Sequence, residues 1–112
     1  EIRLVPDKRT LEIDYDDGRR LRLAAEYLRV ESPSAEVKGH GPGQRVTPPG
    51  KRNVAIVALE PIGNYAVRIR FDDGHDTGLF SWDYLYKLGT EEKTIWADYL
   101  KRLAAQGLKR EP

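Results

Sequence analysis

The residues that could do chemistry are two pairs of neighbouring carboxylates. Asp16-Asp17 and Asp72-Asp73 have the residue types that a glycoside hydrolase holds across its cleft. Each pair, however, stands directly before a glycine and between two alternating apolar segments. Aspartate is favoured at such turns because it tolerates left-handed geometry and hydrogen-bonds its own backbone. We therefore interpret both pairs as hairpin turns rather than catalytic acids.

Two histidines complete the set. His40 and His75 are the only side chains able to act as a neutral-pH base or an imidazole ligand. The 34 residues between them do not fit a metal-site spacing, so we expect both to be exposed loop residues. A His75–Asp73 dyad in a small-molecule enzyme is a disfavoured alternative, since neighbouring turn residues seldom point into one pocket. The absence of cysteine excludes a thiolate nucleophile, a disulfide or a cysteine metal site.

Two similar hairpins must position these residues. Residues 11–23 and 67–80 each alternate apolar and polar side chains around an Asp-Asp-Gly turn. A Tyr-Leu pair follows each turn, and Ser81 is placed to cap a helix with Trp82, Leu85 and Leu88 on one face. This repetition predicts a pseudo-symmetric domain in which the two hairpins share a sheet. The alternative is coincidence, because short Asp-Gly hairpins are common.

The remaining segments complete an α+β prediction. We expect a short opening strand near Ile2, a long loop over 31–50 and a central apolar strand over 53–59. Thr90 is placed to cap a final amphipathic helix that ends near Gly107, followed by a frayed tail. The predicted fold class is thus α+β: a small antiparallel-rich sheet built from two Asp-Gly hairpins, covered by short helices and a C-terminal helix.

Composition limits the function classes. The 112 residues fit one domain, and 19 basic residues are nearly matched by 18 acidic ones, giving a net charge of +1. This balance gives no strong electrostatic case for nucleic acid or an anionic membrane. No apolar run is long enough to span a bilayer, so the expectation is a soluble, cytoplasmic protein.

Basic residues offer two further surfaces. The 38–52 loop is basic because it contains Lys38, Arg45, Lys51 and Arg52. Such a loop is usually just solvated, but an acidic partner or RNA could bind to it. Four arginines stand opposite the apolar sides of the hairpins: Arg20, Arg22, Arg68 and Arg70. They form either a charged outer sheet face or a docking surface for an acidic partner.

A family resemblance adds to this interpretation. Two stretches of the chain resemble the domain at the N-terminus of gamma-butyrobetaine hydroxylase and trimethyllysine hydroxylase. The first is the strand–Asp-Gly–strand unit followed by Tyr27-Leu28-Arg29. The second is the run Phe-x-Asp-Gly-His-x-x-Gly-x-Phe-x-Trp-x-Tyr-Leu over 71–85. Stand-alone bacterial versions form the DUF971 family of unknown function, and the domain is also fused to Mrp-type iron-sulfur carrier ATPases. The resemblance covers residues 2–88. It implies a domain over 1–89 that assists another protein, with a C-terminal amphipathic helix over 90–108 packed on the same domain.

The resemblance also implies a zinc site that this chain lacks. In the hydroxylases a Cys-Pro-Cys-x-x-Cys run and the histidine of the second turn hold zinc; here the corresponding residues are Ser32, Ser34, Val37 and His75. Serine hydroxyls are poor zinc ligands compared with thiolates, so we predict that the zinc is lost, that the chain has no cofactor, and that the 31–50 loop is mobile. The iron and 2-oxoglutarate site of the hydroxylases lies on a separate barrel, which this chain is too short to contain.

The sequence therefore predicts a non-catalytic adaptor that binds a protein partner. By family analogy the partner is an iron-sulfur carrier or an oxygenase, and the process is iron-sulfur cluster maturation. The alternative is a nucleic-acid-binding module that uses the basic loop 38–52. The predicted partner-binding residues are His75, Asp76, Trp82, Tyr86, Lys38, Arg45, Lys51 and Arg52.

Overall fold

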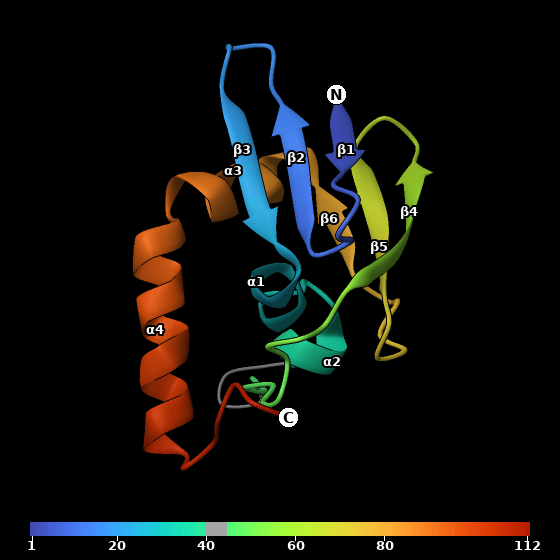
Figure 1. Ribbon diagram of the computed structural model, residues 1–112. Coiled ribbons are helices and arrows are strands. Elements are labelled where there is room, and N and C mark those ends of the chain that lie inside the picture. Colours follow the sequence, from blue (N-terminus) through green and yellow to red (C-terminus); the bar gives the residue numbers. More distant parts are fainter. Residues whose placement is uncertain (40–44) are drawn as a thin grey trace.

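The computed structural model describes residues 1–39 and 45–112, which form two small antiparallel sheets and four helices (Figure 1). The first sheet has the order β1 (Ile2–Leu4), β2 (Thr10–Asp14), β3 (Arg20–Ala24). The second has the order β4 (Ile56–Ile62), β5 (Ala66–Phe71), β6 (Leu79–Ser81). The helices are α1 (Ala25–Val30), α2 (Ala35–Lys38), α3 (Trp82–Thr90) and α4 (Glu92–Ala105). The α+β prediction is confirmed, and His40, which was predicted to be an exposed loop residue, lies outside the described residues.

Both Asp-Gly turns form as predicted. Leu11 pairs with Leu23 across the first hairpin, and Gly18 adopts the positive φ of 89° that the turn requires. Gly74 has a φ of 90° in the second turn, which leads to β6. The two hairpins do not share a sheet, contrary to the prediction, because each recruits its own third strand: β1 pairs with β2, and β4 pairs with β5.

Strand β4 is an edge strand, although the apolar run over 53–59 predicted a central one. It pairs only with β5, and a bulge between Ile56 and Ala58 leaves Val57 half exposed. Pro61 lies within this strand and has no amide hydrogen to donate to a further neighbour. The apolar run therefore reflects burial against the core on one side only.

The inner faces of both sheets pack against α1 and α3 in one core. Fully buried side chains come from every layer, including Leu11, Leu28, Ile69, Phe80 and Leu85. The Tyr27 hydroxyl donates a hydrogen bond of 2.7 Å to the Leu88 carbonyl oxygen, which joins α1 to α3 inside that core. A second, smaller cluster of Val30, Tyr99 and Leu103 holds α4.

The helix ends agree only in part with the predictions. Ser81 caps α3 by accepting the Tyr84 amide hydrogen, as predicted. Thr90 does not cap the last helix; it ends α3, and its hydroxyl donates to the Tyr86 carbonyl oxygen, so α4 follows after a one-residue break. Gly107, with a φ of 65°, ends the helical region as expected.

The C-terminal tail is not frayed. The Gly50 amide donates to the Lys109 carbonyl oxygen at 2.8 Å, and the Arg110 guanidinium holds both carboxylate oxygens of Glu26 at 2.7 Å. The same guanidinium lies over the Trp96 ring. These contacts, which periodicity could not predict, fasten the tail against α1 and residues 50–52.

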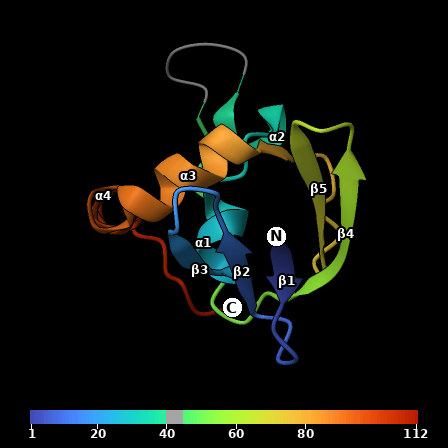
Figure 2. The same cartoon turned by 90° about the horizontal axis from the view of Figure 1, so that it is seen from above.

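Helix α4 and the β4–β5 hairpin lie at opposite sides of the molecule (Figure 2). Within residues 1–39 and 45–112, no helix is long and apolar enough to cross a membrane.

Candidate functional site

His75 is buried at the centre of a hydrogen-bond chain that ends at the exposed Glu36, and it does not lie in an exposed loop as predicted. Its Nε2 lies 2.9 Å from the Ser32 hydroxyl oxygen, and its Nδ1 lies 2.9 Å from a Glu36 carboxylate oxygen. Only 2% of the His75 side chain is exposed. Burial is the main cause that lowers the pKa of His75, followed by the charge of Arg29, while Glu36 opposes the shift.

Ser32, Ser34 and Val37, the positions that the family resemblance compares with zinc-ligating cysteines, are all buried. Ser32 is fully buried, the Ser34 hydroxyl lies 2.6 Å from that of Thr77, and Val37 packs in the interior. Ser34 also caps α2 by accepting the Glu36 amide hydrogen. Hydrogen bonds thus connect the α1–α2 region to the turn after β5, so the described part of the 31–50 loop is tied to the domain.

The chemistry available around His75 is limited by access. A serine, a histidine and a glutamate in hydrogen-bonded sequence have the order of a nucleophilic triad. The Ser32 side chain, however, has no exposed surface, and a Cβ added at Gly78 would approach its oxygen to 2.4 Å. No group of three or more histidine, cysteine or acidic residues able to hold a metal occurs among the residues the structure describes. The arrangement is suited to holding two segments together.

Asp73 is a turn residue, as predicted, and its carboxylate also contacts two cationic side chains. Its carboxylate accepts from Arg29 at 2.8 Å, from Lys51 at 2.6 Å and from the His75 amide at 3.1 Å. These partners lower the pKa of Asp73 to about 2 although burial acts in the opposite direction. Both ring nitrogens of His75 have other partners, Ser32 and Glu36, so Asp73 does not form a dyad with the imidazole.

The predicted basic loop residues are each paired with a carboxylate. Lys38 and Arg45 both contact Glu31, at 3.3 Å and 2.8 Å. The other two pairs are Lys51 with Asp73 and Arg52 with Glu111. The loop therefore presents less net positive charge than its sequence indicates.

The two predicted aromatic residues, Trp82 and Tyr86, are half-buried and have contact partners other than His75. The Trp82 indole nitrogen donates to the Asn64 carbonyl oxygen at 3.1 Å. Tyr86 packs edge-to-face on Tyr15, and its hydroxyl donates to Asp17 at 2.8 Å. Asp76, the remaining predicted residue, is half-exposed next to His75. The eight predicted residues are thus not brought together in one surface.

The outer face of the second sheet, here called the outer sheet face, combines charge with exposed apolar side chains. It is formed by Ala58, Glu60, Arg68, Arg70 and Leu79, which the strand register places on the side opposite the core. Glu60 contacts Arg68 at 2.9 Å and Arg70 at 3.5 Å. Leu79 is 44% exposed. The alternation of β5 pointed to the arginines, but Leu79 could be placed beside Arg68 only once the pairing was known.

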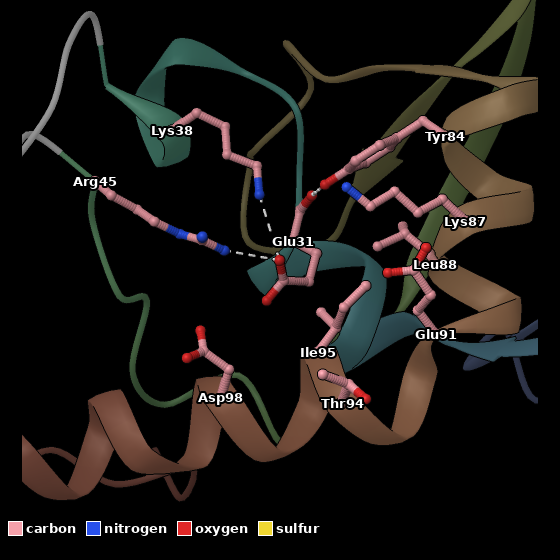
Figure 3. A pocket seen from close by; sticks show the side chains of 10 residues that line it. All are labelled: Glu31, Lys38, Arg45, Tyr84, Lys87, Leu88, Glu91, Thr94, Ile95 and Asp98. Atoms are coloured by element: carbon pink, nitrogen blue, oxygen red, sulfur yellow. Dashed lines mark hydrogen bonds and ion pairs between the residues drawn. The ribbon is translucent and has the colours of Figure 1, made fainter.

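A cleft lies between α2, α3 and α4, with a volume of about 310 Å³ (Figure 3). Lys38 and Arg45 form one wall, and both reach the carboxylate of Glu31 at its back. Leu88 and Ile95 supply apolar surface on the opposite side. Only Lys38 and Arg45 of this set were predicted site residues, because the facing residues come from helices whose relative placement the sequence did not reveal.

Comparisons with known proteins agree with this architecture. The family model described as gamma-butyrobetaine hydroxylase-like, N-terminal, matches residues 2–86. Two NMR solution structures are similar to the whole chain, one at 51% identity with a TM-score of 0.85 and 88% of its own chain covered, the other at 50% and 0.84 with 83% covered. A crystal structure of a DUF971 family protein of unknown function from Acidithiobacillus ferrooxidans is 40% identical, with a TM-score of 0.61 over 80% of this chain and 89% of that one. No curated protein matches the chain.

Proposed function

Because the chain belongs to the gamma-butyrobetaine hydroxylase-like N-terminal family, which includes DUF971 proteins, we propose that it is a non-catalytic adaptor that binds another protein. The observation that carries this proposal is the outer sheet face. Exposed apolar side chains set beside arginines are typical of protein interfaces, where arginine is enriched. Of the five large apolar residues that are exposed in the described chain, Val57, Tyr65 and Leu79 belong to this sheet or its turn.

The first sheet provides an internal comparison. Its outer arginines have as many carboxylate partners as there are arginines: Arg22 contacts Glu12 at 2.6 Å, Arg20 contacts Asp14 at 2.8 Å, and Arg3 contacts both of these carboxylates and Glu1. On the outer sheet face, Arg68 and Arg70 share the single carboxylate of Glu60. The charge of Asp76 also raises the pKa of Arg68, but its contribution is smaller than that of Glu60. The two related hairpins therefore differ in surplus positive charge.

This surplus favours an acidic partner surface. A guanidinium has five donors, and one shared carboxylate leaves several of them available for carboxylates of a partner. Leu79 would lose its exposed apolar area in such a contact. The proposed partner therefore presents acidic residues around a small apolar centre.

The family analogy proposes who that partner is. Fusion to Mrp-type carriers and to oxygenases supports an iron-sulfur carrier or an oxygenase, and thus a place in iron-sulfur cluster maturation in the cytoplasm. The loss of the zinc site belongs to the same proposal, and it is supported by the hydrogen bonds that Ser32 and Ser34 make around His75. A non-catalytic role is supported by the complete burial of Ser32.

Affinity capture tests the adaptor proposal. The tagged protein is incubated with lysate of the source organism, and retained proteins are identified by mass spectrometry. Replacing Arg70 by Glu and Leu79 by Ser should remove the specific partner, whereas Arg22→Glu on the first sheet should not. A captured protein that survives the first variant, or is lost equally in the control, would contradict the outer sheet face as the contact.

The nucleic-acid alternative gains no support from the basic loop. Each of its four predicted basic residues has a carboxylate partner, which reduces the charge available to phosphates. We therefore expect the protein to flow through heparin at low salt. Retention that declines steeply with salt would instead favour nucleic acid.

A further inference from the structure

The cleft between α2, α3 and α4 gathers more cations than anions around one buried carboxylate. Only 3% of the Glu31 side chain is exposed, and it contacts three basic residues: Lys38 at 3.3 Å, Arg45 at 2.8 Å and Arg102 at 3.4 Å. Asp98, which also lines the cleft, contacts Arg102 at 3.0 Å. With Lys87 and Glu91 included, four basic residues face three carboxylates, which leaves a surplus of one positive charge. The surplus lies at the wall of the cleft, where Lys38 and Arg45 point inward from one side (Figure 3).

The surplus positive charge disfavours the charged form of Lys38. Burial lowers the pKa of Lys38, and the charges of Arg45 and Arg102 act in the same direction, so that Glu31 compensates only in part. Lys87 also lines the cleft from α3, and among the described residues it makes no ion pair. Lys38, Arg45 and Lys87 together keep several unused donors, since an ammonium has three and a guanidinium five.

The rest of the cleft selects among anions. Leu88 and Ile95 provide an apolar surface opposite the cations, suited to a hydrocarbon chain. Glu91 and Asp98 stand on the α3–α4 side, where a second negative charge on the ligand would be repelled. The volume of about 310 Å³ is at the small end of pockets that bind small molecules.

We propose that this cleft is a binding site for a small organic monocarboxylate, whose head group is held by Lys38, Arg45 and Lys87 and whose hydrocarbon chain lies on Leu88 and Ile95. The site is independent of the adaptor proposal, because the outer sheet face lies on the opposite side of the molecule from α4 (Figure 2). Either proposal can fail without the other.

Titration with hexanoate, followed by amide chemical shifts of the labelled protein, tests the site. We expect saturable shifts for residues that line the cleft, and affinity about tenfold weaker in Lys87→Gln, the loss expected for one charge-assisted hydrogen bond. Lys87 is exposed, so this variant should keep its fold. Lys101→Gln is the matched control, since Lys101 is exposed on α4 and does not line the cleft.

Three ligands distinguish the chemistry. Hexanol has the same chain without the charge, inorganic phosphate has charge without a chain, and citrate has three carboxylates. Weaker binding of all three than of hexanoate supports the proposal. Equal binding of hexanol, equal or tighter binding of phosphate or citrate, no saturable shifts in the cleft, or an equal loss in Lys101→Gln would each overturn it.

Discussion

Replacement of Glu31 by Gln should destabilise the protein more than any other loss of a single negative charge. The change keeps the size of the side chain but leaves Lys38, Arg45 and Arg102 around a neutral amide. Removing one partner from a fully buried pair costs about 3–5 kcal/mol. Here the three cations are between 21% and 39% exposed, so water screens part of the loss, and we expect about 2 kcal/mol.

Thermal and urea unfolding, monitored by circular dichroism, measure this loss. For a chain of this size, 2 kcal/mol corresponds to a melting temperature lower by about 10 °C. Glu111→Gln is the matched control, because Glu111 and its partner Arg52 are both 55% exposed, and water screens such a pair so that its loss should leave the melting temperature nearly unchanged. Equal effects of the two variants would refute the argument that Glu31 joins α1, α2 and α4.

Three further predictions concern the region around His75 and the C-terminal tail. The folded state holds the pKa of His75 below its ordinary value of about 6.5, so the unfolded chain binds a proton at a higher pH than the folded protein does. The free energy of unfolding, measured with urea, should therefore fall as the pH drops below about 6.5. His75→Gln should flatten this part of the stability profile. The dialysed protein should hold less than half an equivalent of zinc by elemental analysis, and zinc retained by the wild type but lost in His75→Ala would show that the metal site survives. Removal of residues 109–112 should lower the free energy of unfolding by about 1–2 kcal/mol, since Glu26 then loses both hydrogen bonds to Arg110; an unchanged melting temperature would mean that the tail contributes nothing.

Local patterns were sufficient to predict the hairpins and the start of α3. The alternation around Asp17-Gly18 and Asp73-Gly74 depends on neighbouring residues alone, and Ser81 caps a helix through an amide three residues away. The sheet arrangement could not be derived in this way. Whether two hairpins share a sheet depends on which strands pair with their free edges. Those strands, β1 and β4, lie outside the repeated units and pair with β2 and β5.

The candidate surfaces were harder to predict because they combine distant residues. His75 follows a turn, where exposure is the usual expectation, yet its ring lies against Ser32, Glu36 and Phe71 and is almost fully buried. Lys38 and Arg45 were identified as basic, but their shared carboxylate, Glu31, follows an apolar helix and gave no signal as their partner. Sequence indicated which residues were polar; only tertiary packing decided which of them remained available.

The affinity of the captured partner for surface variants tests the adaptor account most directly. Isothermal titration of the purified partner against the wild type, the Arg70→Glu/Leu79→Ser variant and the Arg22→Glu control measures the outer sheet face alone, provided that all three melt at similar temperatures. The account predicts a dissociation constant at least tenfold higher for the first variant, a loss of about 1.4 kcal/mol, and an unchanged value for the control. Equal dissociation constants for all three proteins would contradict it.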